Sequence, residues 1–348
     1  MKYNTATLPN GLRIIHLPST SQVVYCGFGI NAGTRNELPE EEGVAHFCEH
    51  TTFKGTSHRK ALTIMNCLET VGGELNAFTN KEDTVYYAAI LKEHFTKAVD
   101  LLSDIVFHSL YPQSEINKEI EVICDEIESY NDSPAELIYD LFENIIFHGH
   151  PLGHNILGDA WQLRTYNSET AKTFTQRFYK PQNAVFFAYG DINFDNLVEL
   201  LKKRTKGFGV QKPIIGDADI VAPLPAYQPT TKCIEKGTHQ THVMIGNRAY
   251  SVHDERRIAL YLLNNIIGGP SMNARLNLSL RERYGLVYTV ESTMVSYSDT
   301  GVWCTYFGCD PHDVKRCLKL VKKELQRVID KPLSPNQLNA AKRQIKGQ

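Results

Sequence analysis

The pentapeptide His46-Phe47-Cys48-Glu49-His50 lies within residues 41–53, a segment that we expect to form a helix. Residues four apart on a helix share a face and lie about one turn from each other. His46 and His50 can therefore bind one metal ion, and Glu49 lies close enough to act on a metal-bound water. The order H-x-x-E-H reverses the zinc motif H-E-x-x-H. Cys48 points away from the histidine face and is predicted to lie in the core.

Length and composition indicate a globular protein of two domains. The chain has 348 residues, of which 42% are hydrophobic and 22% charged. A net charge of -2 gives no electrostatic argument for nucleic acid or an anionic membrane, so neither is expected as a partner. No apolar run has the length of a membrane span. The first 15 residues resemble neither a signal peptide nor a transit peptide, which favours a cytoplasmic location, with a trimmed presequence as the alternative.

The order of predicted elements occurs twice along the chain. A hairpin with an Asn10-Gly11 turn (residues 5–17) opens the first copy. Residues 84–87 match 301–304, and Pro112 matches Pro335, each at an offset of about 220 residues. We therefore expect an α+β fold with two tandem homologous domains, each a mostly antiparallel sheet packed with helices. The predicted boundaries are 1–210 for the metal-binding domain, 211–228 for a linker and 229–348 for the second domain.

The second copy is predicted to be incomplete. The first copy continues for about 80 residues beyond its helix at 114–130, whereas the second ends at Gln348, inside the matching helix. A domain that lacks its last strands should expose a sheet edge or apolar surface.

A catalytic zinc usually takes three protein ligands, so a third ligand is needed besides the two histidines. The predicted helix at 114–130 is rich in carboxylates, and Glu119 and Glu126 share one face of it beside an apolar stripe. From the pattern alone, a solvated acidic face is an equally good interpretation. The apolar stripe consists of Ile116, Ile120, Ile123 and Ile127, and the other carboxylates are Glu115, Glu121, Asp125 and Glu128.

Several stretches together resemble the pitrilysin and mitochondrial-processing-peptidase family of zinc metallopeptidases, the inverzincins. They span nearly the whole chain. They are the Asn-Gly-Leu hairpin, residues 43–56 with HFCEH and FKGT, residues 72–89 (GGELNAFTNKEDTVYYAA), the helix that ends in EVICDEIESYNDSP, HPLG at 150–153, and residues 279–290.

The resemblance implies roles for individual residues. Glu126 would be the third zinc ligand, and Glu119 the acid that hydrogen-bonds a ligating histidine and fixes its tautomer. Asn76 and Ala77 would begin an edge strand that pairs with an extended substrate. By itself, the asparagine would more simply be a turn residue.

The resemblance also implies that Arg281 and Tyr288, seven residues apart, face the substrate carbonyl and stabilise the developing oxyanion. The alternatives are a surface ion pair between Arg281 and Glu282, and a core aromatic at Tyr288.

The expected function is that of a zinc-dependent metalloendopeptidase that hydrolyses extended, unfolded peptides inside a dimeric chamber. Glu49 would be the general base. Relatives with four such domains close as two halves, so we expect a homodimer in which Arg281 and Tyr288 of one subunit face the zinc of the other. A heterodimer with a related, metal-free subunit is the alternative assembly. The alternative function is a non-catalytic scaffold or partner subunit of a processing peptidase, against which the complete metal set argues.

Overall fold

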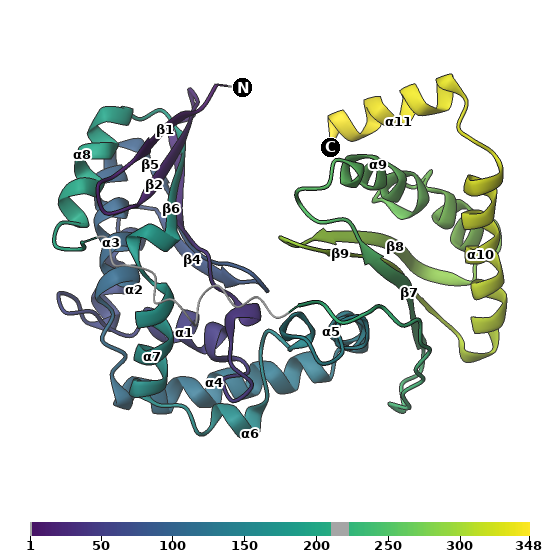
Figure 1. Ribbon diagram of the computed structural model, residues 1–348, viewed down its shortest axis with the longest axis horizontal. Helices are drawn as coiled ribbons and strands as arrows, with labels where there is room; N and C mark the ends of the chain where they lie inside the picture. The colour runs from purple at the N-terminus through teal and green to yellow at the C-terminus, as the bar shows by residue number, and fades with distance from the viewer. Residues whose placement is uncertain (1, 210–222) are drawn as a thin grey trace. The chain divides into compact units, whose positions relative to one another are not determined.

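A computed structural model describes residues 2–209 and 223–348. The chain forms two compact units (Figure 1). Among the described residues, no helix combines the length and the apolar character needed to cross a bilayer. The first unit consists of Met1–Ser129 and Gly149–Leu224, and the second of Tyr130–His148 and Pro225–Gln348.

The first unit is built on a six-stranded sheet with the order β1-β2-β6-β3-β5-β4. Every neighbouring pair is antiparallel except β2 and β6, which are parallel, so the predicted mostly antiparallel sheet is confirmed. Strand β4 lies at one edge. The strands are β1 (Asn4–Thr7), β2 (Arg13–Pro18), β3 (Val23–Ile30), β4 (Glu74–Thr79), β5 (Thr84–Leu91) and β6 (Ala184–Gly190).

The expected hairpin joins β1 to β2. Gly11 has a φ of 87°, a backbone conformation that residues other than glycine rarely adopt. The side chain of Asn10 accepts a hydrogen bond from the Leu12 amide at 3.2 Å. The turn chemistry read from the sequence therefore sets the register of this pair, Asn4 opposite His16.

Helices pack on this sheet and enclose the first core. Helix α3 contacts β3 and β5, α8 contacts α3, and α1 contacts both β4 and α7. Alternate residues of β3, namely Val24, Cys26, Phe28 and Ile30, are fully buried. The helices of this unit are α1 (Val44–Thr52), α2 (Ala61–Glu69), α3 (Phe95–His108), most of α4 (Gln113–Asn131), α6 (Ala160–Leu163), α7 (Ser168–Phe178) and α8 (Phe194–Arg204).

The second unit repeats part of this topology. Its sheet has the order β7-β9-β8, the same arrangement as β3-β5-β4, with all pairs antiparallel. Residues 223–348 contain no counterparts of β1, β2 and β6, so β7 and β8 are both sheet edges. The elements are α5 (Pro134–Ile146), β7 (Thr241–Ala249), α9 (Arg256–Gly268), a π-helical turn (Asn277–Glu282), β8 (Val287–Ser296), β9 (Gly301–Cys309), α10 (Val314–Asp330) and α11 (Pro335–Gly347).

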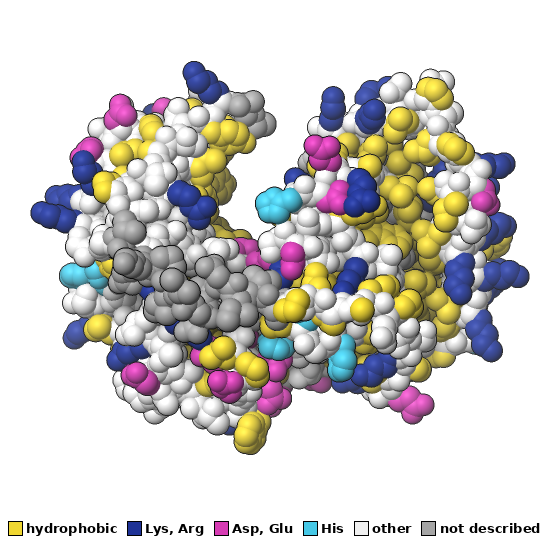
Figure 2. All heavy atoms as spheres, in the orientation of Figure 1, with side chains coloured by type: hydrophobic (Ala, Val, Ile, Leu, Met, Phe, Trp, Pro, Cys, Tyr) yellow, Lys and Arg dark blue, Asp and Glu magenta, His cyan; other side chains and the backbone are white. Residues whose placement is uncertain are grey.

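Large apolar side chains are exposed on the second unit. Figure 2 shows apolar side chains gathered over this part of the molecule. The most exposed of them include Ile258, Tyr261, Met272 and Ile329.

Helix α5 groups with the second unit, whereas the predicted boundary at residue 210 puts it in the first domain. Its packing against β7 gives the reason. Arg248 of β7 donates to the Ile146 carbonyl at 3.0 Å, and the Tyr139 hydroxyl donates to Glu291 of β8 at 2.6 Å. Residues 211–222 of the expected linker lie outside the described residues, and 223–228 form neither helix nor strand.

Candidate metal centre and active site

The histidine-bearing helix α1 is fixed at its first turn by a buried carboxylate. Gly43 precedes the helix with a φ of 86°. The carboxylate of Glu37 accepts hydrogen bonds from the Gly43 amide at 3.0 Å and the Ala45 amide at 2.9 Å, which caps free N–H groups of the helix. Burial raises the pKa of Glu37 well above its usual range. Phe47 and Cys48 lie in the core, as expected for Cys48.

The two histidines of α1 lie side by side, with ring centroids 4.6 Å apart. Their Nε2 atoms approach one carboxylate oxygen, Oε2 of Glu126, at 3.9 Å for His46 and 3.4 Å for His50. The three side chains bring one donor atom each to within 4.8 Å of one another. The structure thus brings together the three residues that the sequence and the family resemblance suggested as ligands.

The electrostatics of these histidines differ. Burial, reinforced by the neighbouring His50, lowers the pKa of His46 to about 4, so His46 is neutral and has a lone pair to offer. Burial would also lower the pKa of His50, but hydrogen bonds to Glu119 and Glu126 raise it to about 9. The same carboxylates that raise the pKa of His50 would also favour a metal cation at this position.

Helix α4 carries Glu119 and Glu126, which lie two turns apart on one face of the helix. Glu119 is buried, and its Oε1 lies 3.0 Å from Nδ1 of His50. Its Oε2 lies 2.5 Å from Nζ of Lys54. Burial would raise the pKa of Glu119, but the hydrogen bonds from His50 and Lys54 lower it. A solvated acidic face describes the remaining carboxylates of α4, of which Glu121, Asp125 and Glu128 are exposed.

These residues fit a catalytic divalent metal. Two imidazole nitrogens and one carboxylate oxygen are the donor set of catalytic zinc, which keeps a fourth position open. Nδ1 of His46 is buried and has no hydrogen-bond partner among the described residues, and its Nε2 is too far from Glu126 for a hydrogen bond. The contact between Glu119 and Nδ1 of His50 is of the kind that orients metal-ligating imidazoles.

Glu49 lies beside this group on α1 and is half-buried. Its Oε2 accepts a hydrogen bond of 2.7 Å from the hydroxyl of Thr79, the last residue of β4. Burial raises the pKa of Glu49, an effect that the Thr79 hydrogen bond and the charge of His50 partly offset. A carboxylate with a raised pKa can accept a proton and release it again near neutral pH.

The suggested substrate strand is the edge strand β4. Asn76 and Ala77 lie within β4 opposite Tyr87 and Tyr86 of β5, so the interpretation of Asn76 as a turn residue is wrong. The side chain of Asn76 is exposed. The side of β4 that faces away from β5 has no strand partner among the described residues, which leaves room for an added strand.

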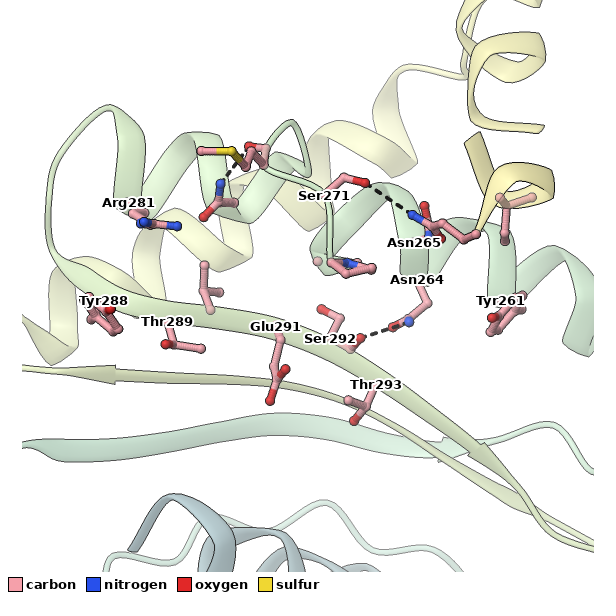
Figure 3. A pocket seen from close by; sticks show the side chains of 18 residues that line it. Tyr261, Asn264, Asn265, Ser271, Arg281, Tyr288, Thr289, Glu291, Ser292 and Thr293 are labelled. Atoms are coloured by element: carbon pink, nitrogen blue, oxygen red, sulfur yellow. Dashed lines mark hydrogen bonds between the residues drawn. The ribbon is translucent and has the colours of Figure 1, made fainter. Parts of the chain in front are cut away.

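Arg281 and Tyr288 lie together in the second unit, in a cavity of about 670 Å³ (Figure 3). The Arg281 guanidinium lies 6.0 Å from the centroid of the Tyr288 ring, at the outer limit of a cation–π contact. Its Nε lies 3.8 Å from Glu282, so the surface ion pair also forms. Tyr288 is 83% exposed, which rules out a core aromatic.

Three residues at this centre were not predicted from the sequence: Glu37, Lys54 and Thr79. Lys54 lies in the FKGT stretch and Thr79 follows Asn76-Ala77-Phe78, so both lie in segments that carry the family resemblance. Their side-chain partners, however, depend on contacts between distant parts of the chain.

Comparison with known proteins identifies the family. Residues 13–160 match the insulinase family (peptidase family M16), and residues 165–345 match the peptidase M16 inactive domain. The chain therefore belongs to peptidase family M16, the insulinase family, which confirms the resemblance drawn from the sequence.

Its relatives are named as zinc proteases. One from Bacillus subtilis, the uncharacterized zinc protease YmxG, is 33% identical over 98% of this chain and 82% of its own length. A Streptomyces coelicolor protein, also named an uncharacterized zinc protease, is 33% identical over 98% of this chain and 75% of its own. The crystal structure of a protease from Helicobacter pylori matches the fold with a TM-score of 0.90 at 22% identity, over 99% of this chain and 84% of that one.

Proposed function

We propose that this chain is a zinc-dependent endopeptidase that cleaves extended, unfolded peptides. The observation that carries the proposal is the convergence of His46, His50 and Glu126 within 4.8 Å, next to a carboxylate on the same helix. The names of the relatives support zinc as the metal.

His46, His50 and Glu126 would hold the metal, and Glu119 would keep the ring of His50 oriented. A bound zinc ion lowers the pKa of a water ligand and polarises a carbonyl oxygen. Glu49 would take the proton from the attacking water and pass it to the leaving amine. Its raised pKa suits the second of these steps, because the protonated form must last long enough to act as an acid.

Strand β4 would bind the substrate as an added strand. Main-chain hydrogen bonds to a sheet edge bind peptides of many sequences, and side-chain pockets refine the choice. The position of β4 at the edge of the sheet, in contact with α1, supports this role for Asn76 and Ala77. Folded proteins offer few free extended segments, so unfolded peptides would be preferred.

Arg281 and Tyr288 would stabilise the charge that develops on the scissile carbonyl oxygen. Both sets of residues occur in this one chain, so a homodimer is sufficient for two complete sites. We propose that Arg281 and Tyr288 of each subunit serve the metal group of the other, in a chamber enclosed by the two copies. A heterodimer with a related, metal-free subunit would supply one site in the same way.

The test is cleavage of a quenched fluorescent peptide library by the wild type and by Glu49→Gln, with the zinc content of each determined. The proposal predicts that both bind zinc and that only the wild type cuts. Glu128→Gln is the matched control, because it removes an exposed carboxylate from α4 outside the metal group. A wild type that holds zinc and cuts no peptide would favour the non-catalytic scaffold.

A further inference from the structure

Thr79 joins the edge strand to the candidate general base. It is the last residue of β4, is 8% exposed, and pairs with Thr84 of β5 in the sheet register. Its hydroxyl donates to Oε2 of Glu49 at 2.7 Å. The contact links two segments 30 residues apart in the sequence.

The hydrogen bond restricts a torsion that is otherwise soft. The terminal torsion of a glutamate is broad, so a carboxylate without partners turns freely. Among the described residues, Thr79 provides the hydrogen bond to Oε2 of Glu49, and no donor to Oε1 is found. Threonine is β-branched and stiff at χ1, and pairing with β5 fixes its backbone. Oε1 of Glu49 is thus left as the oxygen that can accept a proton.

We propose that Thr79 is a positioning residue for Glu49. Its hydroxyl holds Oε2 and leaves Oε1 directed for proton transfer. The inference rests on the proposed peptidase function for its kinetic consequence but not for its structural one.

The kinetic test compares Thr79→Val, which keeps the shape and removes the hydroxyl, with Thr79→Ser, which keeps the hydroxyl. At equal zinc content, we expect Thr79→Val to lower kcat by about ten- to a hundredfold, the cost of a misplaced catalytic group, with KM within about twofold. Thr79→Ser should stay within about threefold of the wild type. Added to Glu49→Gln, Thr79→Val should cause no further loss.

Thr84→Val is the matched control. Thr84 is also buried, on the neighbouring strand, but its hydroxyl donates to the Ala32 carbonyl at 2.9 Å. We expect this variant to lower the melting temperature while keeping kcat. A loss of kcat in Thr84→Val as large as in Thr79→Val, or equal losses in Thr79→Ser and Thr79→Val, would show a merely structural role and overturn the inference.

A second measurement does not depend on activity. Crystal structures of the zinc-loaded wild type and Thr79→Val should show the Glu49 carboxylate turned or in several conformers only in the variant. An unchanged carboxylate would contradict the inference. If the zinc-loaded wild type cuts no peptide but Glu49 moves in Thr79→Val, the proposed function fails and the positioning role stands.

Discussion

Nδ1 of His50 lies 3.0 Å from Oε1 of Glu119, which leaves Nε2 of His50 facing Glu126 at 3.4 Å. A donor at Nδ1 fixes the tautomer in which Nε2 carries the lone pair. In the proposed metal centre, Glu119 would therefore present His50 as a ligand rather than bind metal itself.

Replacement of Glu119 should weaken zinc binding. Glu119→Gln keeps the size of the side chain but loses the charge that pairs with His50 and Lys54. We expect zinc affinity to fall about ten- to a hundredfold, the usual cost of losing such a partner, as measured by competition with a chromophoric chelator. Glu121→Gln, an exposed site on the same helix, should leave affinity unchanged. Equal affinities of Glu119→Gln and the wild type would remove Glu119 from the site.

Zinc should stabilise the folded protein by binding His46, His50 and Glu126. A ligand that binds only the native state raises stability by about 2.7 kcal/mol at a hundredfold excess over its Kd. We expect added zinc to raise the melting temperature of chelator-treated wild type, and Glu126→Ala to abolish this rise. If zinc stabilised Glu126→Ala as strongly as the wild type, the metal would bind elsewhere.

Acidic pH should destabilise a hydrogen-bond network around Asp104 in the first unit, apart from the candidate metal centre. Asp104 is buried and accepts hydrogen bonds from Thr56 at 2.7 Å and from Arg59 at 2.5 Å, and His58 and His108 also face it. Burial would raise the pKa of Asp104, but these hydrogen bonds lower it. A depressed native pKa stabilises the fold above the unfolded pKa, and this stability is lost as pH falls through the native value.

Asp104→Asn should accordingly lower the free energy of unfolding near neutral pH, by about 2–4 kcal/mol. The difference from the wild type should shrink as the pH falls below the ordinary range for aspartate. Urea unfolding at several pH values measures both quantities. A difference that is constant down to strongly acidic pH would show that the charge of Asp104 contributes nothing.

The proposed dimer makes a prediction about mixed variants. Glu49→Gln and Arg281→Ala should each be nearly inactive alone. In a heterodimer of the two, one site combines Glu49 from one copy with Arg281 from the other. Randomly mixed subunits should therefore recover about a quarter of the wild-type rate, since half the dimers hold one of two sites. A mixture as inactive as its components would show that both residues act within one subunit.

Much of this architecture could be predicted from local patterns. The Asn10-Gly11 turn and the spacing of His46 and His50 are both short-range signals, and each is found where expected. The placement of α5 is not local, since it depends on long-range contacts such as that between Arg248 and the Ile146 carbonyl.

The candidate site, too, could be predicted only in part from local sequence patterns. Two histidines four apart indicate a shared metal, but the choice of Glu126 among the carboxylates of α4 needed the family resemblance or the three-dimensional structure. The role of the Thr79 hydroxyl has no sequence signal of its own, because threonine is common in β-strands for its β propensity alone. Only the fold brings it to Glu49.

The most direct test of Glu49 as the general base is the initial rate of peptide cleavage by Glu49→Gln relative to the wild type at matched zinc content. We expect a loss of about a hundredfold or more, the contribution of a general base, with zinc affinity unchanged. Equal rates for the two proteins would contradict it.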